Sequence, residues 1–216
     1  AEQAAPVIAA FAVAAIVIGG LICLAQTEVK RLIAYSSVGH MGFVLLGIAT
    51  MSAMGLQAAL IGNLAHGLIT GLLFFLVGAL KDRAHSGELS DLGGLRETSP
   101  RLAALLGFAA LASLGLPGLA GFWGEAFAVI AAAQRGWYAA AVLAAIGGAL
   151  AAAYFLRLLR KVTHGAPVLK LSGLAGFELA SWAPLVVLTL VLGLAPILVT
   201  AVTAPAVDAL VEAMSR

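Results

Sequence analysis

Three ionisable side chains lie deep inside long apolar stretches of this sequence, where a charged group is costly. His40 lies nine residues past Arg31, His66 ten past Leu56, and Glu125 ten before Arg135. At a helical rise of about 1.5 Å per residue, all three reach about 14 to 15 Å from a membrane face, close to the midplane. Groups at that depth turn towards water or towards one another. Histidine and carboxyl groups in series can pass a proton along, so we predict a proton relay.

Polar residues near these groups could support the relay. Asn63 and Thr70 lie three residues before and four residues after His66. They therefore share a helical face with His66, and we expect that face to hold water. Lys30 is most simply a membrane anchor at the start of its stretch, but it could also feed protons inward.

Two other roles fit the histidines. Each histidine alone could make an interhelical hydrogen bond that only stabilises the fold. Two mid-depth histidines on different helices could instead be the axial ligands of a haem, which would make the chain an electron-transferring membrane subunit. The haem alternative leaves Glu125 without a role, whereas a relay accounts for all three groups.

The stretch that carries Glu125 is too long for one straight span. Residues 102–133 would measure about 48 Å as a helix, against a hydrocarbon core of about 30 Å. Pro117, Gly118 and Gly121 offer a place to break it, because proline removes a helical hydrogen bond and glycine tolerates irregular dihedrals. We therefore predict a discontinuous helix of the kind that lines ion paths in transporters. A simple proline kink is the structural alternative.

Six apolar stretches must position these residues. The chain has 216 residues, of which 62% are hydrophobic and 10% charged, a balance that excludes a soluble globule and places the chain in lipid. The stretches comprise residues 6–24, 32–49, 56–80, 102–133, 137–156 and 182–202. Each is too apolar and too long for a strand, so we predict an all-α, polytopic transmembrane helical bundle in one domain, residues 1–216, with the fourth span discontinuous. The net charge of +2 includes no long basic run, so nucleic acid is not expected as a partner.

Lysine and arginine residues are unevenly divided between the loops. If the loops alternate between two sides, ten of the twelve fall on one side and Arg135 and Arg216 on the other. The ten are Lys30, Arg31, Lys81, Arg83, Arg96, Arg101, Arg157, Arg160, Lys161 and Lys170. The positive-inside rule makes their side cytoplasmic, so both ends of this segment are expected on the outer side. Trp137 and Tyr138 then lie at the outer interface, where aromatic rings are favoured.

The sequence around His40 resembles a known family. Residues 28–42, EVKRLIAYSSVGHMG, closely resemble the signature of the antiporter-like subunits of complex I, the proton-translocating NADH:quinone oxidoreductase. Further matches follow in the same order at residues 64–67, 72–74, 82–85, 93–95, 114–118 and 121–125. Among the paralogues the NuoM type is most similar, because Glu125 follows Gly124 where the NuoL and NuoN types place a lysine.

The resemblance carries expectations about the site. It implies that this chain is the C-terminal half of such a subunit and contains the last six of its transmembrane helices. It also implies that His40 and His66 belong to a hydrated central proton relay and that Glu125 ends the outlet half-channel. The family's glutamate–lysine pair and its central lysine belong to earlier helices, which this sequence does not contain.

The resemblance also implies a function and its setting. We expect a proton-translocating subunit of NADH:quinone oxidoreductase in a bacterial plasma membrane, in contact with the lipid bilayer and with other membrane-arm subunits, including neighbouring antiporter-like ones. NADH, FMN, iron–sulfur clusters and quinone are expected elsewhere in the complex, with no cofactor or metal in this chain. A multisubunit cation/proton antiporter or a membrane-bound hydrogenase is the alternative from the same lineage.

Overall fold

The computed structural model describes residues 2–165, 167 and 173–215. Throughout these residues the chain forms α-helices and no β-strand, apart from an isolated bridge between Glu28 and Glu88. The helices are α1 (Ala5–Ala25), α2 (Val29–Ala49), α3 (Ala53–Ala84), α4 (Leu95–Thr98), α5 (Pro100–Ser113), α6 (Ala120–Gln134), α7 (Tyr138–Thr163), α8 (Gly176–Leu194) and α9 (Ile197–Ser215). The all-α prediction is confirmed.

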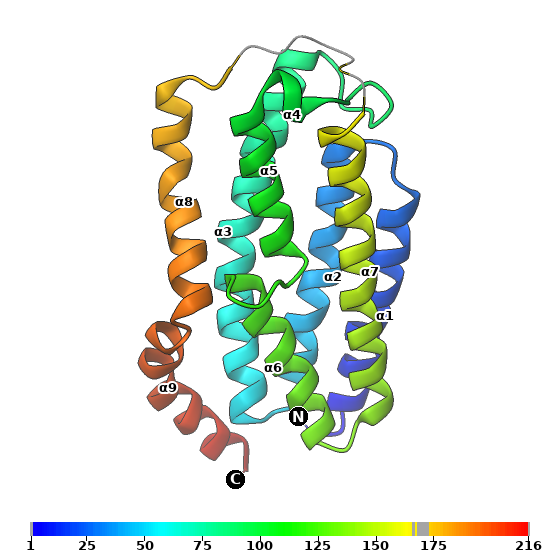
Figure 1. Cartoon of the computed structure of the whole chain (residues 1–216). Coiled ribbons are helices and arrows are strands. Elements are labelled where there is room, and N and C mark those ends of the chain that lie inside the picture. The colour runs from blue at the N-terminus through cyan, green and yellow to red at the C-terminus, as the bar shows by residue number, and fades with distance from the viewer. Residues whose placement is uncertain (1, 166, 168–172, 216) are drawn as a thin grey trace.

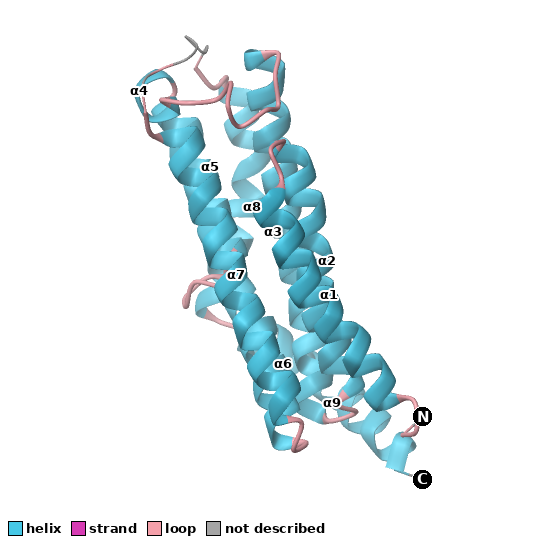
Figure 2. Cartoon of the chain, turned by 90° about the vertical axis from the view of Figure 1, so that its right-hand side faces the viewer, coloured by secondary structure: helices cyan, strands magenta, loops and turns pink. Residues whose placement is uncertain are grey.

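The long helices run side by side along the length of the molecule, as Figure 1 and Figure 2 show. α2 packs between α1 and α3, and α7 packs against α1 and α6. Among the described residues, six helices are long and apolar enough to cross a membrane, namely α1, α2, α3, α7, α8 and α9. The chain is therefore a polytopic transmembrane bundle, as predicted.

The fourth predicted span is broken in two. α5 has 14 residues and α6 has 15, so at about 1.5 Å per residue neither alone crosses a core of about 30 Å. The break lies at mid-height (Figure 2), where Gly115 and Gly118 adopt φ of 77° and 94° and flank Pro117. The discontinuous helix is confirmed. Gly121 instead lies within α6, where a β-carbon would stand 2.2 Å from the carbonyl oxygen of Ala112, so its role is close packing against α5.

The prediction for the sixth span, residues 182–202, is wrong. The structure has two helices, α8 and α9, because α8 ends at Leu194 and Pro196 follows. Ala195, directly before the proline, has φ −133° and ψ 65°, since the proline ring excludes helical dihedrals at the preceding residue. α9 then lies beside the N-terminal part of α3 and is held there by Gln57, whose Nε2 donates to the carbonyl of Thr200 (3.2 Å).

Two helices extend past the ends predicted from hydropathy. α3 continues from residue 80 to Ala84, and α7 from residue 156 to Thr163. Each extension carries cations in its last turn, which interact favourably with the carbonyl end of a helix. Arg83, for example, donates from Nη1 to the carbonyl of Ala79 (3.1 Å). Apolar run length therefore underestimates these helices.

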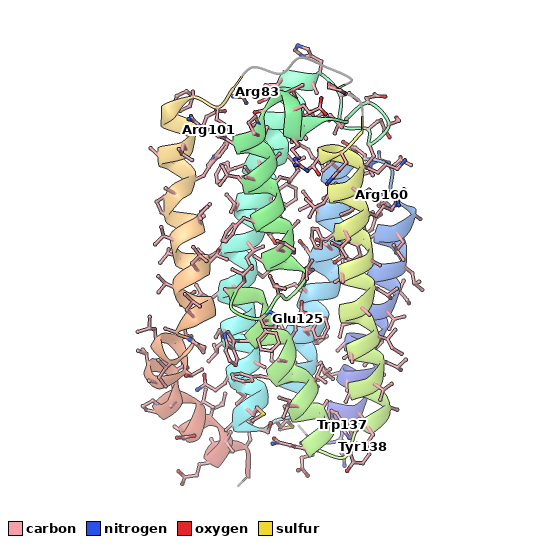
Figure 3. All side chains as sticks on the ribbon, viewed as in Figure 1. Arg83, Arg101, Glu125, Trp137, Tyr138 and Arg160 are labelled. Atoms are coloured by element: carbon pink, nitrogen blue, oxygen red, sulfur yellow. The ribbon has the colours of Figure 1, made fainter. Side chains whose placement is uncertain are left out.

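The two ends of the bundle differ in character. Arg83, Arg101 and Arg160 lie at one end, and Trp137 and Tyr138 at the other (Figure 3). The N- and C-terminal ends both lie with the tryptophan and tyrosine (Figure 1). We call the arginine-bearing end the charged end. Lys170 and Arg216 lie outside the described residues.

Candidate functional site

His40 on α2 and Glu125 on α6 meet in the interior of the bundle. Nδ1 of His40 lies 3.0 Å from Oε1 of Glu125, and the two side chains are 11% and 16% exposed. Glu125 lies inside the bundle, between the charged end and the end that carries Trp137 and Tyr138 (Figure 3). Because α6 starts only at Ala120, the helix break is what delivers Glu125 to this depth on the first turns of a new helix.

The second ring nitrogen of His40 is also engaged. Oγ of Ser113, the last residue of α5, lies 3.1 Å from Nε2 of His40. Ser113 is 4% exposed. Sequence reasoning missed this residue, although its place directly before the break was a usable signal. His40 is thus held between the two halves of the broken helix.

This three-residue chain is compatible with two proton arrangements. In one, Nδ1–H of His40 donates to the Glu125 carboxylate, and the Ser113 hydroxyl donates to Nε2. In the other, protonated Glu125 donates to Nδ1, and Nε2–H donates to Ser113 Oγ. The second arrangement holds one proton more than the first. It forms when Nε2 takes up a proton from the side of Ser113 and Nδ1 passes its own proton to the Glu125 carboxylate, with no change in heavy-atom positions, which is the chemistry of a relay.

His66 on α3 stands next to His40. Their ring centroids are 5.7 Å apart with the planes tilted by 46°, a separation that one bridging water can span. Oγ1 of Thr70, one turn further along α3, lies 3.1 Å from Nδ1 of His66. The structure thus brings together all three ionisable groups selected from the sequence, with Thr70 beside them.

A cavity connects these groups. It has a volume of about 30 Å³, and its wall includes His40, His66, Thr70, Ser113 and Glu125. A space of about 10 to 15 Å³ holds one water, provided that polar partners are present. The cavity therefore has room for about two waters within reach of every polar side chain in its wall.

Close backbone packing flanks the carboxyl group of Glu125. A β-carbon on Gly124 would stand 2.5 Å from Cα of Gly62, so α6 and α3 touch backbone to backbone beside Glu125. Oε2 of Glu125 faces the break, where a β-carbon on Gly115 would stand 2.8 Å away. Glycine at these positions lets the carboxyl group sit against main chain on two sides.

A second, smaller cavity borders His40 between α1, α2 and α7. It has a volume of about 10 Å³, and Tyr154 forms part of its wall. The Tyr154 side chain is only 2% exposed. The sequence gave no reason to select Tyr154, which lies in an alanine- and leucine-rich stretch next to the charged end.

Two predicted supporting residues are not part of the cavity wall. Asn63 is exposed on the surface of α3. Gly62 faces the cavity, and the next residue of a helix lies about 100° further around the axis, which turns Asn63 away. Lys30 lies in the first turn of α2, ten residues or about 15 Å from His40 along that helix. The structure therefore places neither residue in contact with the relay groups, and their supporting roles stay predictions.

The haem alternative fits this geometry poorly. Both ring nitrogens of His40 are within hydrogen-bond distance of other side chains, Glu125 and Ser113. A cavity of about 30 Å³ is also far smaller than a porphyrin. The donor set and the space both favour proton exchange over haem ligation.

Curated relatives match this chain over most of its length. A curated relative from Rhodobacter capsulatus, named NADH-quinone oxidoreductase subunit M, is 42% identical over 202 residues, which is 92% of this chain and 39% of that protein. A Nostoc protein named NAD(P)H-quinone oxidoreductase chain 4-3 is 43% identical over 167 residues, 74% of this chain and 30% of that protein. The chain therefore spans well under half the length of these relatives.

Solved structures share the architecture. A chain of respiratory complex I from Thermus thermophilus superposes with a TM-score of 0.91 at 31% identity, covering 97% of this chain and 45% of that one. A chain of the Mrp complex from Dietzia gives a TM-score of 0.88 at 24% identity over 97% of this chain and 48% of that one, a likeness of fold.

The family comparison is the most direct. The sequence profile described as NADH:quinone oxidoreductase/Mrp antiporter, transmembrane, matches residues 1–151, which contain every relay residue described above. Together with the relatives named subunit M and chain 4, this match confirms the resemblance to the NuoM type. The chain belongs to the NADH:quinone oxidoreductase/Mrp antiporter transmembrane family.

Proposed function

We propose that this chain conducts protons in the membrane arm of an NADH:quinone oxidoreductase. Protons pass through water between His66 and His40 and on to Glu125, which releases them towards the end of the bundle that carries Trp137. The observation that carries this proposal is the His40–Glu125 contact of 3.0 Å at a helix break beside a polar cavity. Irregular backbone at membrane depth is tolerated where it lies beside water, and the helix break places irregular backbone beside this cavity.

The proposal includes a location and partners. The charged end faces the cytoplasm of a bacterium under the positive-inside rule, so both termini of this segment lie on the outer side of the plasma membrane. Other membrane-arm subunits, including neighbouring antiporter-like ones, contact the chain. The redox cofactors, namely NADH, FMN, iron–sulfur clusters and quinone, are bound by other subunits of the complex.

A second candidate function has one specific observation in its favour. The family description also includes Mrp antiporters, and the Dietzia Mrp chain has the same fold. In that case the same relay exchanges protons for a cation without NADH. The relatives at 42 to 43% identity, which are named as quinone oxidoreductase subunits, favour the first candidate.

The test is proton translocation by the complete complex in proteoliposomes. With Glu125→Gln in the full-length subunit, we expect the number of protons moved per NADH oxidised to fall, because the amide cannot carry a proton between His40 and the outside. NADH oxidation in the presence of an uncoupler should persist. Glu97→Gln is the matched control, since Glu97 lies exposed on α4 at the charged end.

The outcome separates the candidates. A Glu125→Gln complex with an unaltered proton-to-NADH ratio would refute the relay. A complex that exchanges sodium for protons without NADH, and loses this exchange with Glu125→Gln, would favour the antiporter instead.

A further inference from the structure

The helix that carries Glu125 is tied to α8 by one hydrogen bond. Nε1–H of Trp123, two residues before Glu125, donates to the carbonyl oxygen of Gly193 over 2.8 Å. The Trp123 ring is also packed against Phe122 and Phe127, at centroid distances of 5.1 and 5.5 Å. Its indole is therefore held in place on α6 while its N–H reaches α8.

The Gly193 carbonyl is free to accept because α8 stops. In a continuous helix it would accept from the amide of residue 197, four positions on. α8 ends at Leu194, ahead of Pro196, and the last four carbonyls of a helix lack partners within it. The end of α8, which hydropathy does not reveal, thus leaves the Gly193 carbonyl available to accept from Trp123.

Gly193 also touches the break itself. A β-carbon on Gly193 would stand 2.3 Å from the carbonyl oxygen of Gly118 and 2.4 Å from Cα of Leu119. Both atoms belong to the segment between α5 and α6. α8 therefore packs backbone to backbone on the segment that aims α6, directly beside its hydrogen bond to Trp123.

The other end of α8 is fixed to α3. Oε2 of Glu178 accepts from Nη2 of Arg83 over 2.7 Å and from the amide of Ala175 over 2.8 Å. The side chains of Arg83 and Glu178 are 16% and 13% exposed, so this ion pair is mostly shielded from solvent. α8 is thus attached to the helix that carries His66 and to the helix that carries Glu125.

We propose that Trp123 is a positioning residue for Glu125, and that α8, through Gly193, holds the broken helix where the carboxyl group meets His40. Two contacts act together: the Gly193 carbonyl fixes the first turn of α6 through Trp123, and the Gly193 backbone supports the segment around Gly118. This inference rests on the proposed proton relay. It adds a residue and a helix that do not touch the relay groups.

The test uses the assembled complex with the full-length subunit. Trp123→Phe keeps an aromatic ring and removes the N–H donor. We expect proton translocation to slow by about two- to tenfold, the factor that a single lost hydrogen bond gives. The pH of half-maximal translocation should move by about 0.4 to 1 pH unit for the same reason. Gly193→Ala should cause the same two changes with Trp123 intact, because the methyl group displaces the break.

Trp182→Phe is the matched control. Trp182 lies on α8 and is 6% exposed, but it belongs to the apolar core nearer the charged end. Its replacement can lower the yield of complex and should leave the pH of half-maximal translocation unchanged. A purely structural role for Trp123 would give that same pattern.

The outcomes distinguish this inference from the relay. A Trp123→Phe complex with the wild-type pH profile overturns the positioning role. The relay itself is still supported in that case if Glu125→Gln abolishes translocation. Should Trp123→Phe not assemble, Gly193→Ala decides by the same criterion. Normal translocation by Glu125→Gln would instead remove the relay itself.

Discussion

Nδ1 of His40 and Oε1 of Glu125 lie 3.0 Å apart although 85 residues separate them in the chain. The contact forms because α2 crosses the bundle beside the point where the fourth span breaks. Ser113 on one half of the break and Glu125 on the other hold opposite ring nitrogens of the same histidine. The broken helix is therefore the element that assembles the site.

Ser113→Ala should weaken proton translocation without stopping it. The change removes the hydroxyl next to Nε2 of His40 and leaves that nitrogen to water. A lost hydrogen bond of about 0.5 to 1.5 kcal/mol corresponds to about a two- to tenfold slower rate. Proton uptake by proteoliposomes measures this. Ser181→Ala, on the exposed face of α8, should have no effect, and an equal loss in both variants would count against a specific role for Ser113.

Thr70 is expected to orient the His66 ring. Thr70→Val preserves the shape and removes the hydroxyl that lies 3.1 Å from Nδ1. We expect translocation to slow by about the same two- to tenfold factor. Thr70→Ser should restore most of the rate, because it retains the hydroxyl. A serine variant as slow as the valine variant would show that methyl packing, and not the hydrogen bond, matters at this position.

Gly124→Ala should destabilise the subunit. Its β-carbon would stand 2.5 Å from Cα of Gly62, so α3 and α6 would have to separate, at a typical overpacking cost of about 1 to 3 kcal/mol. Gly107→Ala is the control, because a β-carbon there meets no atom within 4 Å. It should be neutral or stabilising by up to about 1 kcal/mol, since alanine favours a helix. Thermal denaturation of the purified complex compares the two, and equal behaviour would refute the tight contact.

The ion pair between Arg83 and Glu178 should contribute a measurable coupling energy. Its atoms are 2.7 Å apart and the side chains are mostly shielded, so we expect about 1.5 to 3 kcal/mol for this charged hydrogen bond. Arg83→Gln, Glu178→Gln and the double variant form a mutant cycle. Losses of stability that simply add would show that the two residues do not interact in the complex.

Hydropathy and the positions of proline and glycine predicted much of the fold. The first three helices follow their apolar runs, and Pro117 with Gly118 marked the break correctly. The bounds of the sixth span were predicted wrongly because Pro196 lies inside an apolar run. Hydropathy does not change at this proline, although the helix must end before it. The helix ends that extend beyond the apolar runs were also not predicted, because hydropathy falls there while the helix continues. Arginine and lysine side chains reach out of the bilayer while their backbone stays helical.

The candidate site was only partly readable from the sequence. His40, His66 and Glu125 were identifiable because ionisable groups are rare at membrane depth. Ser113 lies directly before the break, but a serine hydroxyl in a membrane helix often bonds its own backbone, so the sequence analysis did not select it. Asn63 was assigned to the relay on helical spacing alone. Spacing shows that two residues share a side of a helix, but it does not show which of them a neighbouring helix covers. Contacts between distant helices, such as that of Trp123 with Gly193, need the tertiary structure.

Infrared difference spectroscopy of the assembled complex, with and without reduction by NADH, tests the central claim most directly. The carboxyl band that Glu125→Gln removes belongs to Glu125, and the contact with His40 predicts that His40→Gln shifts this band. A Glu125 band that keeps its frequency in His40→Gln, or a redox difference spectrum with no Glu125 band, would contradict proton exchange between the two residues.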